Sequence, residues 1–240
     1  MAAFGGYPQN VTFSTVNVAK GGGSENLLIN PRGKINQLNE PDGVLSAGVY
    51  FCDGWKAGAS GAEVYRDADG FRLISGSIVQ LVPNNLGAGR NLRANMDIIS
   101  GSPMMSINGS SDNVVSSDSE YISLEISGNN SKFNRIILAE SLEIPIYQQQ
   151  ADELSPCHAF LYVEKQDNSG NGIWINTLKA YFGSDSWGEI EFPCVMHKIP
   201  ACSAVISSGA VSVMVATRKR FNCKGLAGNT LHSLIADARP

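Results

Sequence analysis

The sequence contains few charged residues and none of the long apolar segments that define membrane proteins. Lysine and arginine total 18 and aspartate and glutamate total 22 in 240 residues, which leaves a net charge of −4. Without a basic stripe the surface is a poor match for nucleic acid. No apolar run approaches the length of a membrane-spanning helix. Residues 1–10 also lack the basic region and apolar core of a signal peptide.

Cysteine is scarce, and its spacing fits neither a disulfide framework nor a zinc site. The five cysteines are Cys52, Cys157, Cys194, Cys202 and Cys223. Their odd number and the absence of C-x-x-C spacing argue against both structures. We therefore expect the chain to fold in a reducing cytoplasm and to hold no cofactor.

Sequence motifs for catalysis are also missing. The three histidines, at positions 158, 197 and 232, lack metal-ligand spacing. No serine lies in a G-x-S-x-G turn and no phosphate-binding glycine loop is present. Asp67 and Asp69 could both face a calcium ion, but Asp67-Ala68-Asp69-Gly70 is better explained as a turn. The sequence predicts a protein that is not an enzyme.

What the chain does contain is glycine, serine and asparagine between short alternating segments. Residues 121–126 read YISLEI, in which isoleucine and leucine face one side and polar residues face the other. Residues 77–82, 92–99 and 133–138 are similar strand candidates. Regular short strands without helical periodicity predict an all-β fold, a jelly-roll-like β-sandwich.

Turn signals and changes in pattern divide the chain into four parts. Residues 1–25 form an N-terminal attachment arm that ends in a glycine run, and residues 26–146 form the sandwich. Residues 147–166 are a helical junction, in which Ser155 caps a short helix. Cys157 in this junction is interpreted as a small buried apolar residue. Residues 167–240 form a smaller C-terminal β domain, in which residues 173–182 and 189–196 could form a hairpin.

Several segments together resemble a known family. Residues 26–37 read NLLINPRGKINQ, residues 48–56 read GVYFCDGWK and residues 76–82 read GSIVQLV. These segments resemble the entry segment, aromatic strand, Asp-x-Trp corner and glutamine-containing strand of a β-sandwich module in bacteriophage tail-fibre proteins. Residues 153–157 and 191–205 resemble its later segments. Residues 90–93, RNLR, depart from the tyrosine-containing strand of the family.

The resemblance implies a virion protein that binds a glycan on the host surface. Sugars stack on aromatic rings beside polar groups, so the glycan-binding candidates are Trp174, Trp187, Glu189 and Trp55. Trp55 could instead be a core residue of the sandwich. The alternative function is a purely structural virion protein, such as a head fibre, a decoration protein or a tail adaptor.

The expected partners follow from the same resemblance and from the arm. Residues 11–18 alternate and precede the glycine run, so they could add a strand to another virion protein or form an edge strand of the sandwich. Phage fibres are commonly trimers, which implies a homotrimer. We expect assembly in the bacterial cytoplasm, location in the virion, and neither nucleic-acid binding nor membrane insertion.

Overall fold

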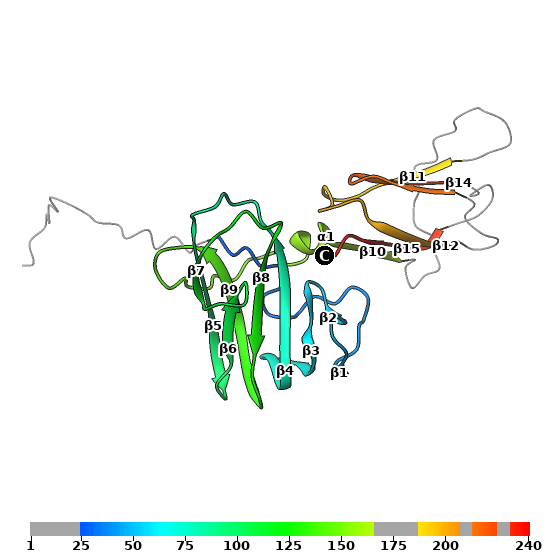
Figure 1. Ribbon diagram of the computed structural model, residues 1–240. Helices are drawn as coiled ribbons and strands as arrows, with labels where there is room; N and C mark the ends of the chain where they lie inside the picture. The colour runs from blue at the N-terminus through cyan, green and yellow to red at the C-terminus, as the bar shows by residue number, and fades with distance from the viewer. Residues whose placement is uncertain (1–24, 166–186, 207–212, 225–230) are drawn as a thin grey trace, which may run out of the picture.

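The helices and strands of the described residues are almost all antiparallel β-strands, which confirms the predicted all-β sandwich with a short helix (Figure 1). A computed structural model describes residues 25–165, 187–206, 213–224 and 231–240. The predicted arm strand at residues 11–18 and a predicted strand at 173–182 lie outside these ranges. No helix in the described part of the chain is long and apolar enough to cross a membrane.

The larger β region is built from nine strands between residues 43 and 140. They are β1 (Gly43–Leu45), β2 (Tyr50–Cys52), β3 (Trp55–Asp67), β4 (Gly70–Pro83), β5 (Asn91–Ser100), β6 (Met104–Ile107), β7 (Asn113–Val115), β8 (Tyr121–Ser127) and β9 (Ser131–Glu140).

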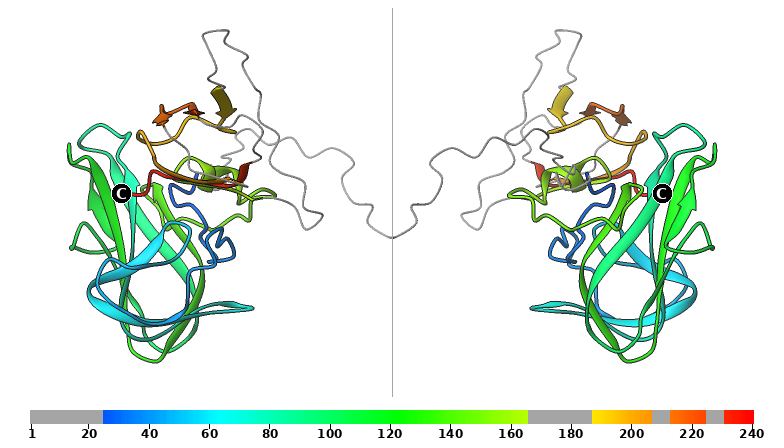
Figure 2. Two further views of the ribbon diagram at one scale, coloured as in Figure 1. Left: turned by 90° about the vertical axis from the view of Figure 1, so that its right-hand side faces the viewer. Right: turned by 90° about the vertical axis from the view of Figure 1, so that its left-hand side faces the viewer.

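The long strands β3 and β4 each belong to both layers of this sandwich. The second half of β4 pairs with β8, which pairs with β6, whereas the first half of β4 pairs with β9. Strand β9 also pairs with β5, and β5 pairs with the edge strand β7. One continuous sheet therefore bends back on itself and encloses its own core (Figure 2).

Two glycines make the bend between the layers possible. Gly61 and Gly76 both have left-handed backbone conformations, with φ of 80° and 81°. A Cβ atom on Gly76 would lie 2.2 Å from the carbonyl oxygen of Gly61, so the two strands approach too closely for any side chain at Gly76. The register of β3 against β4 shifts at this point, between Ala57 and Ala62.

Four aromatic side chains fill one end of the core between the layers. Phe71 lies at their centre: its ring centroid is 6.0 Å from that of Phe51, 5.5 Å from that of Trp55 and 5.8 Å from that of Phe133. All four side chains are completely buried. Edge-to-face and offset contacts of this kind add stability beyond the area buried.

The smaller β region consists of two three-stranded antiparallel sheets. One contains β10 (Leu161–Lys165), β15 (Leu231–Asp237) and β12 (Ala201–Ile206), in that order. The other contains β11 (Trp187–Glu191), β14 (Arg220–Lys224) and β13 (Val213–Ala216). Buried side chains including Phe192, Met196 and Phe221 form a separate core here.

The helix α1 (Ser155–His158) lies between the two β regions, but Ser155 does not cap it. Leu154 occupies the capping position, and Asp152 Oδ1 accepts the backbone N–H groups of Leu154 and Ser155 instead. The predicted cap is therefore wrong, because the aspartate three residues earlier satisfies these donors. Cys157 is fully buried as predicted, and burial raises the pKa of its thiol.

The last residues of the chain connect the two regions. The Arg239 guanidinium bonds Glu40 Oε1 at 2.7 Å and lies 4.1 Å from the centroid of the Tyr50 ring. Tyr50 Oη in turn donates to the main-chain oxygen of Pro240 at 2.7 Å. The Arg239 side chain is only 7% exposed, so this ion pair is largely shielded from solvent.

Candidate functional site

The segment that enters the sandwich, residues 26–30, is held by side-chain amides at both ends. Asn26 Oδ1 accepts the backbone N–H of Leu138 at 3.1 Å, and Asn26 Nδ2 donates to the carbonyl oxygen of Ile136 at 2.9 Å. The backbone N–H of Leu27 also donates to the Leu138 carbonyl at 2.8 Å. These bonds attach the segment to the part of β9 that does not pair with β4.

Asn30 and Trp55 fix the other end. Asn30 has a left-handed φ of 46° and is buried, and its Nδ2 donates to the carbonyl oxygens of Ile35 and Asp53. The indole N–H of Trp55 donates to the Asn30 carbonyl at 2.9 Å. A buried indole needs such an acceptor, so this bond explains a tryptophan in the core at this position.

Two glutamines complete the network. Gln80 Nε2 donates to the Ile29 carbonyl at 3.0 Å and Gln80 Oε1 accepts the Ile29 N–H at 2.8 Å. The amide thus makes the two hydrogen bonds that the backbone of a neighbouring strand would make to Ile29. Gln37 bonds the Asp53 carboxylate and the Leu161 carbonyl of β10. The polar residues of the sequence pattern thus form one hydrogen-bonded network around the entry segment.

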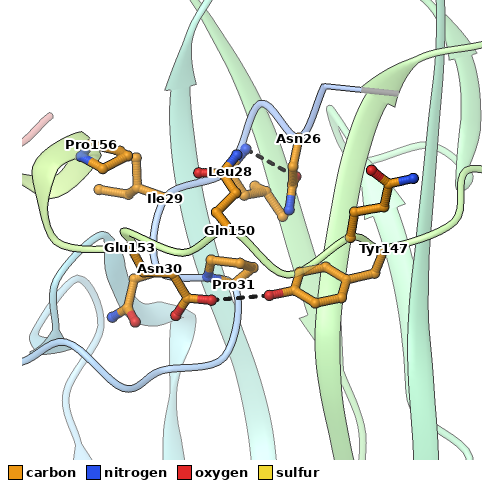
Figure 3. A pocket seen from close by; sticks show the side chains of 10 residues that line it. Asn26, Leu28, Ile29, Asn30, Pro31, Tyr147, Gln150, Glu153 and Pro156 are labelled. Atoms are coloured by element: carbon orange, nitrogen blue, oxygen red, sulfur yellow. Dashed lines mark hydrogen bonds between the residues drawn. The ribbon is translucent and has the colours of Figure 1, made fainter. Parts of the chain in front are cut away.

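A small cavity opens beside this segment, on the side facing residues 147–156 (Figure 3). Its volume of about 10 Å³ is close to the space one water molecule needs. Its walls are Asn26, Leu28, Ile29, Asn30, Pro31, Tyr147, Gln148, Gln150, Glu153 and Pro156.

Glu153 is the charged residue in the wall of this cavity. Its side chain is 6% exposed, and its Oε1 accepts from Arg32 Nε at 2.8 Å and from the Tyr147 hydroxyl at 3.0 Å. Its Oε2 is buried and has no hydrogen-bond partner among the described residues. Burial, followed by the neighbouring Glu153 charge, raises the pKa of Tyr147 to about 12, so the phenol stays protonated as a donor.

A wider groove adjoins the small cavity, and the two share the side chains of Asn26, Leu28, Ile29, Gln150 and Pro156. Its volume is about 370 Å³, near the lower end of the range for ligand pockets. The remaining walls are Glu25, Leu27, Val82, Pro83, Asn85, Leu86, Ile122 and Phe160. The groove therefore combines an apolar surface with amide groups.

The amides of Gln148 and Gln150 carry no hydrogen bond within the described part of the chain. Both residues are exposed, and each amide can donate and accept. Together with Glu153 Oε2, they give the cavity and groove unused hydrogen-bonding groups next to apolar side chains. That combination suits a neutral ligand with both C–H surface and hydroxyl groups.

The residues predicted to bind glycan that the structure describes lie in two different β regions. Trp55 is fully buried in the sandwich core, so no sugar can reach its ring; the core interpretation is confirmed and its glycan-binding candidacy is corrected. Glu189 lies on β11 in the smaller β region and pairs with Arg220 at 3.1 Å. Trp187 begins the same strand. Trp174 lies outside the described residues.

Comparison with known proteins identifies no relative for this arrangement. No family model, no curated protein and no solved structure matches the chain.

Two other groups of polar side chains, around Lys132 and around His197, are held by ion pairs and hydrogen bonds within the fold. The Lys132 ammonium lies 2.9 Å from Asp67 and 2.7 Å from Asp69, so a lysine already neutralises the two carboxylates of the predicted turn. His197 shares a hydrogen bond of 2.8 Å with the Tyr121 hydroxyl between the two β regions. Within the described residues, no three histidine, cysteine, aspartate or glutamate side chains gather as a metal site would require.

The sequence marked Glu153 only as part of a segment that resembles the phage family. Nothing near it in the sequence points to Arg32, which lies 121 residues away, or to the cavity that Glu153 lines. Tyr147 and Gln150 carry no motif at all. Their contribution depends on the path of residues 147–156 across the entry segment.

Proposed function

We propose that this protein is a non-catalytic attachment module of a phage virion that binds a glycan on the host surface. The observation that carries the proposal is the groove of about 370 Å³ at the entry segment. Its apolar walls match the C–H faces of a sugar, and its amides match the hydroxyl groups. The resemblance of residues 26–37 and 48–56 to the phage module supports the virion assignment.

The size of the groove also sets the expected strength of binding. One sugar in one shallow groove forms few hydrogen bonds and buries little surface, so a single site binds weakly. Several copies on one particle bind one polysaccharide with much greater avidity. A homotrimer, as the family resemblance implies, would bring three grooves together, and the N-terminal arm would connect them to other virion proteins.

Binding to bacterial surface polysaccharides tests this function directly. Purified full-length protein is displayed in many copies on beads and exposed to a panel of extracted capsular and lipopolysaccharide glycans. We expect retention of at least one glycan, and competition by the same glycan free in solution. If no polysaccharide is retained at any density of protein, the glycan-binding function is rejected.

A second candidate is a structural virion protein without a ligand, and a row of exposed aliphatic side chains favours it. Leu142, Ile144 and Ile146 are 75%, 63% and 73% exposed, whereas Pro145 between them is buried. Such a row is costly to leave in water and is typical of surfaces that contact another protein. Arg93 Nη1 and Asn95 Nδ2 bond the carbonyls of Leu142 and Pro145 and hold this segment against β5.

The two candidates respond differently to substitution of this row. In the structural protein, replacing the three exposed residues by serine should abolish incorporation into particles and leave the isolated chain folded. In the glycan-binding protein, the same change should leave polysaccharide retention by beads intact. Light scattering of the purified chain at micromolar concentration measures whether a trimer forms without other virion proteins.

A further inference from the structure

The unpaired oxygen of Glu153 has no explanation in the fold itself. An acceptor that is buried without a partner destabilises the fold, and more so when it is charged. The cost would be recovered if a donor entered the adjoining cavity, which has room for one oxygen atom and its hydrogen. Glu153 lines that cavity together with Tyr147 and Gln150 (Figure 3).

We propose that the cavity beside Glu153 receives one hydroxyl group of a neutral sugar whose ring lies in the adjoining groove. The hydroxyl donates its hydrogen to Glu153 Oε2, and the ring packs against the apolar walls. The inference rests on the proposed glycan-binding function and places its binding site at the entry segment, away from Trp187 and Glu189.

The charges around Glu153 select a neutral donor over a cation. Arg32 Nε already bonds Glu153 Oε1 at 2.8 Å, so the carboxylate is neutralised before a ligand arrives. An ammonium group would then lie close to the guanidinium with only one free oxygen to offset the repulsion. A hydroxyl group carries no charge and needs one acceptor, which Oε2 supplies.

The geometry of the two hollows fits a sugar better than a smaller alcohol. They have five wall residues in common, and in the proposed complex a ring in the groove directs one of its hydroxyl groups into the cavity. Gln150 borders both hollows, and its free amide can bond a second hydroxyl on the ring. A ligand without a ring would leave the apolar walls of the groove exposed to water.

The test uses full-length protein and the methyl glycosides of glucose, galactose, mannose, rhamnose and N-acetylglucosamine, titrated at millimolar concentrations by saturation-transfer NMR. For the tightest of these, each monodeoxy analogue is then compared. We expect one deoxy analogue to bind about tenfold to hundredfold more weakly than its parent, because it cannot donate to the carboxylate. In a Glu153→Gln variant, this difference between parent and analogue should shrink severalfold, because a neutral amide bonds the hydroxyl more weakly than a carboxylate does.

Two further variants guard against a folding artefact. Gln150→Ala changes an exposed side chain and should weaken binding severalfold with no change in the thermal midpoint. Glu143→Gln, in the same region of chain but outside both hollows, is the matched control and should bind as the unaltered protein does.

Each result decides one of the two proposals. If the unaltered protein binds neither these glycosides nor any polysaccharide, the glycan-binding function itself fails. If it binds a glycan and both Glu153→Gln and Gln150→Ala bind equally well, the function stands and the site assigned here is wrong. Loss of binding in Trp187→Ala alone would then place the site in the smaller β region. If every deoxy analogue binds as its parent does, the cavity holds only a water molecule.

Discussion

The hydrogen bonds between Gln80 and Ile29 offer the sharpest test of how the entry segment is held. Gln80 is 2% exposed and lies on the core face of β4, and its amide satisfies both the N–H and the carbonyl of Ile29. Gln80→Leu keeps a side chain of similar size but leaves both backbone groups without a partner. Each such group costs about 1–3 kcal/mol when buried, and Ile29 is half-buried, so we expect a total loss of about 2–4 kcal/mol.

The assay is urea unfolding, combined with hydrogen exchange at the Ile29 amide. The loss would be a large fraction of the stability of a typical domain, so the midpoint should fall clearly while the slope stays constant. Gln149→Leu is the control, because Gln149 is exposed and lies outside the groove. A change below about 0.5 kcal/mol in Gln80→Leu, with unchanged exchange at Ile29, would refute the reasoning.

Three further substitutions test the fold and its junction. Gly76→Ala should cost about 3 kcal/mol, because its φ is +81° and its Cβ would lie 2.2 Å from the Gly61 carbonyl oxygen, whereas Gly87→Ala, in open space, should cost less than about 1 kcal/mol in thermal unfolding. Burial raises the pKa of Tyr50 from 10.0 to about 12, which favours the neutral phenol in the folded state. The stabilisation that the neutral phenol gives the folded state is present below pH 10 and is lost as the pH rises to 12. The difference in unfolding free energy between the protein and Tyr50→Phe should therefore shift by about 1–2 kcal/mol over that range. A constant difference would contradict this. Arg239→Met leaves two carboxylates without their shared cation and should cost about 3 kcal/mol in urea unfolding, and a cost below 1 kcal/mol would show that the pair is effectively solvated.

The strands themselves were predictable from the sequence. Residues 121–126 alternate between apolar and polar side chains, and β8 covers them with every second residue buried. The segments at 77–82, 92–99 and 133–138 likewise fall within β4, β5 and β9. This works because a strand exposes alternate faces with a period of two, which is a property of a few neighbouring residues.

The weaker predictions concern residues whose neighbours in space are distant in sequence. The segment at 189–196 forms a strand only as far as Glu191, and that strand pairs with β14, about thirty residues further along the chain. The aromatic and polar residues at positions 55 and 189 had the right chemistry for a sugar site. Only the fold decided that Trp55 is enclosed and that Glu189 bonds Arg220.

By itself, the sequence determined that the chain is an all-β sandwich and that Asn26, Asn30, Gln37, Trp55 and Gln80 belong to one pattern. The tertiary structure decided what that pattern does: these residues hold the entry segment. Beside that segment Glu153, paired with Arg32, lines a cavity. The physical reason is distance along the chain. Alternation and turn chemistry act between neighbours, whereas a buried amide or carboxylate is explained only by the partner that the sheet topology brings to it.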